Sequence, residues 1–130
     1  DGVHIGQDDA AVSEARRILG PDKIIGVSAH TVDEARAAEQ AGADYLGVGA
    51  VFSTSTKLDA DIVTLQTLRG IRAAVSIPIV AIGGINVENM LQLKGSGIDG
   101  AAVVSALFAQ QDVYAAAKRL YATSKELVFG

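Results

Sequence analysis

The chain has 130 residues and a net charge of −4, and this acidic balance argues against nucleic acid or an anionic membrane as its main partner. It contains no Cys, which excludes a disulfide framework and a thiolate metal site. Hydrophobic residues make up 49%, enough for one domain over residues 1–130 to bury a core. No apolar run approaches the roughly 20 residues that cross a bilayer, so we expect a cytoplasmic protein.

Apolar stretches alternate with amphipathic stretches along the whole chain. Helices are predicted over about 10–19, 32–41, 61–75 and 112–127, with another that Asn86 caps and Gly95 or Gly97 ends. Thr31 and Glu34 form a capping box for the second helix. Strands are predicted before each helix, at 2–5, 24–27, 45–52, 78–82 and 101–104.

Repeated strand-plus-helix units imply parallel strands joined by right-handed crossovers. Two architectures fit this pattern. One is a five-stranded doubly wound sheet. The other is part of a (β/α)₈ barrel, which typically needs about 250 residues. Periodicity alone does not separate them.

The stretch 45–57, YLGVGAVFSTSTK, joins a buried strand to four hydroxyls and the ammonium of Lys57. Hydroxyls, free amides and a cation at a strand end suit an anion such as phosphate. A solvated Ser/Thr turn with a surface lysine is the alternative.

Polar groups also follow the other strands. In parallel α/β folds these loops lie at one edge of the sheet, where sites are built. The groups are Gln7, Asp8 and Asp9 after the first strand, Ser28, His30 and Thr31 at the second, Gly83-Gly84 at the fourth and Ser105 at the fifth.

Several of these residues have two interpretations. Asp8 and Asp9 could bind Mg²⁺, but an N-cap role is the more common use of Asp before a helix. His30 could belong to a site or to a turn, and Gly83-Gly84 could admit a ligand or form a tight turn. His4, inside a strand, is expected to be a core histidine with a satisfied nitrogen.

Five motifs together resemble the thiamine-phosphate synthase family: GVHIGQDD, IIGVSAHT, ADYLGVGAVFSTSTK, IPIVAIGGI and GAAVVSALF. The resemblance covers essentially the whole chain. It implies a partial TIM barrel, α/β in class, whose five parallel βα units correspond to strands 4–8 of a (β/α)₈ barrel. It also implies a Mg²⁺-dependent transferase of thiamine biosynthesis. The family joins aminohydroxymethylpyrimidine diphosphate to thiazole phosphate and releases pyrophosphate.

The resemblance also assigns roles by position. Asp9 matches a Mg²⁺ ligand, and Ser28 and Lys57 match catalytic residues at the pyrimidine diphosphate. In a dissociative route through a pyrimidine carbocation, Mg²⁺ and Lys57 would stabilise charge on the leaving diphosphate. The thiazole phosphate is expected to bind Thr54, Ser55, Thr56, Gly84, Val104 and Ser105.

Two departures from the family pattern stand out. Ser53 replaces a usual Pro, and the family's first three strands, with a second Mg²⁺ ligand, have no counterpart. We therefore expect that this chain alone cannot complete the Mg²⁺–diphosphate site and is at best very weakly active. We also expect it to associate with itself or with a complementary N-terminal half. The alternative functions are a thiazole tautomerase, in which His30 would transfer protons, and a non-catalytic phosphate-binding or assembly half-barrel.

Overall fold

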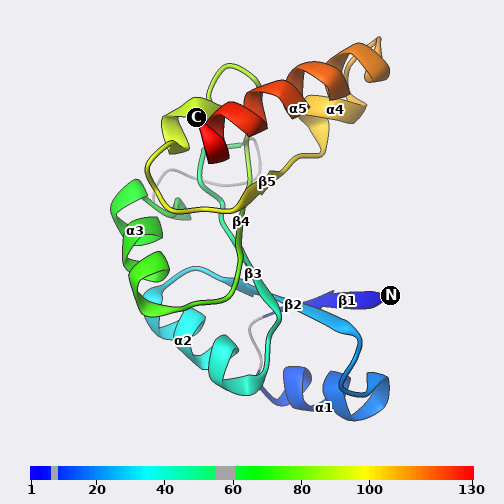
Figure 1. Ribbon diagram of the computed structural model, residues 1–130, viewed down its shortest axis with the longest axis vertical. Coiled ribbons are helices and arrows are strands. Elements are labelled where there is room, and N and C mark those ends of the chain that lie inside the picture. Colours follow the sequence, from blue (N-terminus) through cyan, green and yellow to red (C-terminus); the bar gives the residue numbers. More distant parts are fainter. Residues whose placement is uncertain (7–8, 55–60) are drawn as a thin grey trace.

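The computed structural model describes residues 1–6, 9–54 and 61–130, and its centre is a parallel five-stranded sheet (Figure 1). The strands are β1 (Gly2–Ile5), β2 (Ile24–Ala29), β3 (Tyr45–Val48), β4 (Ile79–Ile82) and β5 (Gly100–Ala102). They pair strictly in chain order. A doubly wound sheet reverses its strand order at a switch point, whereas a barrel adds each strand beside the last. The order confirms the expected α/β partial barrel of five βα units.

Helices follow the strands and cover one side of the sheet. They are α1 (Asp9–Leu19), α2 (Val32–Ala41), α3 (Leu65–Ala74), the short α4 (Ser105–Phe108) and α5 (Val113–Phe129), with a 3₁₀ turn, η2 (Met90–Leu93). Figure 1 shows α1, α2 and α3 in succession along the outer side of β1 to β4, while α5 lies next to β5. No helix in the described ranges has the length and apolar character needed to cross a membrane.

The two faces of the sheet differ because successive side chains alternate between them. One face packs on the helices through side chains that are at most 1% exposed: Ile25, Val27, Leu46, Val48, Ile79 and Ala81. The other, which we call the open face, is hollowed and is lined by His4, Ser28, Tyr45, Gly47, Val80, Ile82 and Ala102. The helix-facing side of the sheet forms the hydrophobic core, so a ligand site is expected on the open face.

The prediction of an α-helix after Asn86 is wrong, because a short 3₁₀ turn stands in its place. Asn86 Oδ1 accepts hydrogen bonds from the backbone N–H groups of Glu88 and Asn89, both at 2.9 Å, and Asn89 Nδ2 donates to the Gly84 carbonyl at 2.8 Å. The Asn86 N–H in turn donates to Asn89 Oδ1 at 2.8 Å, so Asn86 caps a helical start as expected. Only the 3₁₀ turn η2 follows, before Gly95 with a positive φ of 84°.

Other helix and strand boundaries in the structure differ by a few residues from the predicted ones. The third strand ends at Val48 rather than 52, because the N–H groups of Val51 and Phe52 bond to the carbonyls of Ile82 and Gly83 in a loop. The third helix begins after Thr64, whose hydroxyl accepts from Thr67 N at 3.1 Å. The fifth strand covers only Gly100–Ala102, and Ser105, expected in a loop, begins α4.

Candidate functional site

Ser28 stands at the carboxyl end of β2 and faces the open side of the sheet. It lines a cavity of about 300 Å³, here called the Thr54 cavity, together with His30, Gly47, Gly49, Ala50, Thr54, Ile82 and Gly83. Thr54 comes from the loop after β3 and is half-buried. The structure therefore brings together Ser28 and Thr54, two residues that the sequence assigned to different ligands.

Gly84, Val104 and Ser105 line a second cavity at the same end of the strands. This Ser105 cavity, of about 140 Å³, is formed by residues 82–85 at the end of β4 and residues 102–105 at the end of β5. It shares Ile82 and Gly83 with the Thr54 cavity. The two cavities are therefore neighbours along the carboxyl edge of β2 to β5.

The Gly83-Gly84 pair has no room for side chains. Both residues have positive φ, 98° and 69°. A Cβ on Gly83 would lie 2.5 Å from the Ala50 Cβ, and one on Gly84 would lie 2.8 Å from the Phe52 carbonyl oxygen. The dipeptide thus forms a tight turn, and at this turn the loops that follow β3 and β4 approach each other closely.

Part of the expected site lies outside the described residues. Ser55, Thr56 and Lys57 belong to this part, as do Gln7 and Asp8. Asp9 begins α1, the helix that follows β1 along the chain, but its side chain is likewise outside the description. The roles of these residues stay predictions.

His4 and Tyr45 are site residues that sequence reasoning missed. The expectation of a core histidine was wrong, because His4 is exposed on the open face. Both ring nitrogens are hydrogen bonded as expected, Nδ1 to the Tyr45 hydroxyl and Nε2 to the Ser28 hydroxyl, each at 2.9 Å. The three side chains line a further hollow of about 270 Å³, the His4 cavity. Alternation within the strand could have signalled this placement, since Ile5 is the more buried neighbour.

His30 follows β2 and is exposed. Its Nδ1 lies 3.4 Å from Glu34 Oε1, one helical turn along the start of α2. The residue also lines the Thr54 cavity. Both interpretations made from the sequence, a turn residue and a site residue, are compatible with this position.

The lowered carboxyl pKa values among the described residues lie away from this edge. Hydrogen bonds from Arg16 and the Ile25 N–H hold the pKa of Asp44 below its usual value, and Asp44 precedes β3 at the amino end of the sheet. Hydrogen bonds from the backbone and hydroxyl of Ser76 likewise lower the pKa of Glu39. These groups stabilise the fold at the edge opposite the cavities.

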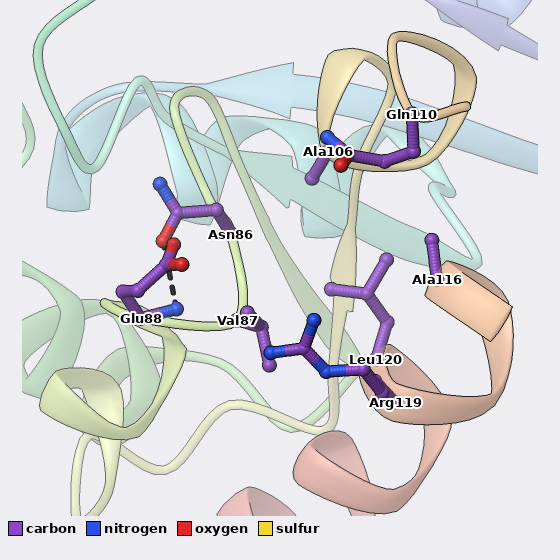
Figure 2. Close-up of a pocket in the computed structure, with 8 residues that line it drawn as sticks. All are labelled: Asn86, Val87, Glu88, Ala106, Gln110, Ala116, Arg119 and Leu120. Carbon is purple, nitrogen blue, oxygen red and sulfur yellow. Dashed lines mark hydrogen bonds between the residues drawn. The ribbon is translucent and has the colours of Figure 1, made fainter. Parts of the chain in front are cut away.

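A fourth cavity, of about 90 Å³, is lined by side chains from the loop after β4, from α4 and from α5 (Figure 2). Two of its lining residues, Asn86 and Ala106, directly follow Ile85 and Ser105, which line the Ser105 cavity. Figure 2 shows Arg119 of α5 beside Val87, with Glu88 of the same loop also lining the cavity. Because a carboxylate and a guanidinium share this lining, it does not select for an anion.

A family model for thiamine monophosphate synthase matches residues 1–107. The chain belongs to the thiamine monophosphate synthase family. The resemblance drawn from the five motifs is thereby confirmed. Curated relatives named thiamine-phosphate synthase include one from Ruminiclostridium cellulolyticum, 56% identical over 92% of this chain, and one from Moorella thermoacetica, 57% identical over 92%. The chain spans 57% and 58% of the length of these two relatives.

A solved thiamine phosphate pyrophosphorylase from Pyrococcus furiosus has the same arrangement. Its similarity covers the whole of this chain and 61% of the other, with a TM-score of 0.88 and 43% identity. A 3-hexulose-6-phosphate synthase matches at a TM-score of 0.70 and 20% identity, which bears on the fold alone. Within the thiamine monophosphate synthase family, then, this chain supplies a continuous run of βα units with their carboxyl-end loops.

Proposed function

We propose that this chain provides the larger part of a thiamine-phosphate synthase site. The reaction transfers the pyrimidine methylene group from a diphosphate to the ring nitrogen of thiazole phosphate. The carbon–oxygen bond breaks, and its electron pair leaves with pyrophosphate. The lone pair of the thiazole nitrogen forms the new carbon–nitrogen bond.

The observation that carries this proposal is the adjacency of the Thr54 and Ser105 cavities, which share Ile82 and Gly83. A substitution between two phosphorylated molecules needs two anion-binding places close enough for the reacting atoms to meet. Hydroxyls stand in both places, Ser28 in the first and Ser105 in the second, and Thr54 lines the first cavity together with Gly83, which the two cavities share. Family membership supports the same assignment.

The roles of single residues follow from this placement. The Ser28 hydroxyl would bind the diphosphate, while Gly84, Val104 and Ser105 would hold the thiazole phosphate. Thr54, with Ser55 and Thr56, would contact that phosphate from the loop after β3. Lys57 would stabilise the negative charge that grows on the leaving diphosphate. Since the diphosphate leaves from a benzylic-type carbon, little general acid–base chemistry is required.

Magnesium is the proposed cofactor, and this chain would contribute one carboxylate, that of Asp9 at the start of α1. The described residues contain no group of three His, Cys, Asp or Glu placed to hold a metal. The donors fit only in part: Mg²⁺ accepts one or two carboxylates, completing its shell with water and substrate phosphates. A bound Mg²⁺ would neutralise charge on the diphosphate.

The proposal is tested by mixing this chain with the amino-terminal segment of a relative and measuring pyrophosphate release with and without Mg²⁺. We expect thiamine phosphate to form in equal amount with the pyrophosphate. A matched mixture with Ser28→Ala should turn over much more slowly, whereas Ser13→Ala, on the exposed side of α1, should not. Thiazole phosphate binding without turnover would instead favour the phosphate-binding module. Self-association, a complementary partner and a cytoplasmic location stay predictions.

A further inference from the structure

The side chains of His4 and Tyr45 meet above a glycine. Gly26 of β2 pairs with His4 of β1 on one side and with Tyr45 of β3 on the other. A Cβ on Gly26 would lie 2.0 Å from the Tyr45 ring. The ring therefore lies across β2, and this brings its hydroxyl to within 2.9 Å of His4 Nδ1.

The other nitrogen of His4 reaches the next row of the sheet. Nε2 lies 2.9 Å from Ser28 Oγ, and Ser28 pairs with Gly47 of β3. A Cβ on Gly47 would lie 2.9 Å from His4 Cε1, so this glycine also leaves space for the imidazole. The result is a hydrogen-bonded chain, from the Tyr45 hydroxyl through His4 to the Ser28 hydroxyl.

A neutral imidazole has one N–H donor and one acceptor nitrogen, which leaves two consistent arrangements. In the first, Tyr45 donates to Nδ1 and the Nε2–H donates to Ser28, whose own O–H stays available. In the second, Ser28 donates to Nε2 and the Nδ1–H donates to Tyr45. A phenol hydroxyl is a better hydrogen-bond donor than an aliphatic hydroxyl, because its aromatic ring withdraws electron density from the oxygen. The chemistry favours the first arrangement.

We propose that Tyr45 and His4 are positioning residues that hold the Ser28 hydroxyl as a hydrogen-bond donor toward an anionic oxygen of the substrate. A serine hydroxyl normally rotates to suit any partner. Here the Nε2–H occupies a lone pair of Ser28 Oγ, and the Ser28 proton is directed elsewhere. Ser28 lines both the His4 cavity and the Thr54 cavity, so the proton is available to a ligand there. The anionic character of that ligand rests on the proposed function.

The first test is the tautomer of His4, read from ¹⁵N chemical shifts of the 13.3 kDa chain at a pH where imidazole is neutral. We expect a protonated Nε2 and an unprotonated Nδ1. Tyr45→Phe should move the signals toward a mixture of tautomers, whereas Tyr121→Phe, an exposed phenol on α5, should leave them unchanged. A protonated Nδ1 in the unmodified chain would overturn the inference, whatever the protein catalyses.

The second test is titration of the same proteins with inorganic pyrophosphate. We expect Tyr45→Phe to weaken binding about three- to tenfold, the effect of one hydrogen bond, and Tyr121→Phe to match the unmodified chain. His4→Gln, whose amide nitrogen can take the place of Nε2, should bind more tightly than His4→Asn, whose amide cannot reach Ser28. Equal binding by Tyr45→Phe and Tyr121→Phe would overturn the role in anion binding. Failure of the mixed enzyme to form thiamine phosphate, with the Nε2–H tautomer present, would instead count against the proposed function.

Discussion

Asp44 and Asp99 occupy equivalent places in two different βα units. Asp44 Oδ2 accepts a hydrogen bond at 2.8 Å from the N–H of Ile25, at the start of the neighbouring strand β2. Asp99 Oδ2 accepts one at 2.9 Å from the N–H of Ile79, at the start of β4. Each aspartate thus joins the amino ends of two adjacent strands.

An arginine donates a hydrogen bond to each of these two aspartates. Arg16 of α1 donates to Asp44 at 2.8 Å, and Arg72 of α3 donates to Asp99 at 2.9 Å. The arginines also donate to backbone carbonyls, Arg16 to Lys23 and Gly42 and Arg72 to Val75 and Ile77. Because a guanidinium has several donors in a fixed fork, one side chain can hold a helix, a loop and a strand together.

Replacing Asp44 with Ala is expected to lower the free energy of unfolding by about 1–3 kcal/mol, because the partly buried Ile25 N–H loses its acceptor. Asp44→Asn should cost less, since an amide oxygen still accepts and the half-exposed ion pair itself contributes little. Urea denaturation measures both changes. Asp22→Ala, in the exposed turn after α1, is the control. A loss for Asp44→Ala no larger than the control's would contradict this account.

The same carboxylates predict how stability depends on pH. The pKa values of Asp44 and Glu39 are lowered in the folded protein by hydrogen bonds, from Arg16 and from Ser76 respectively. A lowered folded-state pKa contributes stability that is present above the unfolded pKa and is lost as pH falls through the folded one. Stability should therefore decline below about pH 4. Denaturation midpoints between neutral and acidic pH measure this, and Asp44→Asn should make the decline shallower.

Local signals in the sequence were sufficient where a residue acts on its own backbone. The second helix begins and ends as expected, because Thr31 Oγ1 accepts from Glu34 N at 3.1 Å and Gly42 ends the helix with a φ of 105°. The short helix α4 was missed because four residues are too few for a helical period to appear. After Asn86 the cap bonds to Glu88 and Asn89 form as expected, but the residues that follow adopt 3₁₀ geometry, with bonds such as Gln92 N to the Asn89 carbonyl at 3.0 Å.

Relations between strands were beyond the sequence signals. The spacing of hydrophobic residues fits either architecture. The resemblance to a known family implied the barrel, and the pairing of β1 to β5 in chain order confirms it. The contact of His4 with Tyr45 likewise depends on register, because both residues pair with Gly26. The cluster at the carboxyl edge was foreseen in part, since parallel strands deliver their loops to one side. The contact of His4 with Ser28 was not.

Gly26 is predicted to tolerate no side chain. Gly26→Ala would place a Cβ 2.0 Å from the Tyr45 ring, so the ring must move and lose its contact with His4. Overpacking of this kind typically costs about 1–3 kcal/mol. Gly100→Ala, in β5 with no atom within 4 Å of its Cβ, is the matched control and should be near neutral. Thermal and urea unfolding compare the two, and equal stabilities would refute the packing argument.

Gly84 is predicted to matter for ligand binding as well as for stability. Gly84→Ala combines a φ of 69° with a Cβ only 2.8 Å from the Phe52 carbonyl oxygen. Gly20→Ala has the same backbone strain, at a φ of 85°, but its Cβ meets nothing within 4 Å. Both variants should lose about 1–2 kcal/mol from the left-handed conformation, and Gly84→Ala should lose more.

Relief of the contact must displace either the loop that carries Phe52 or the wall of the Ser105 cavity. A misplacement of about 1 Å in a binding site can reduce function by about a hundredfold, so we expect Gly84→Ala to weaken thiazole phosphate binding at least tenfold. Calorimetric titration with thiazole phosphate measures this, at a temperature where both variants are folded. Binding by Gly84→Ala as tight as that by Gly20→Ala would show that the phosphate does not occupy the Ser105 cavity.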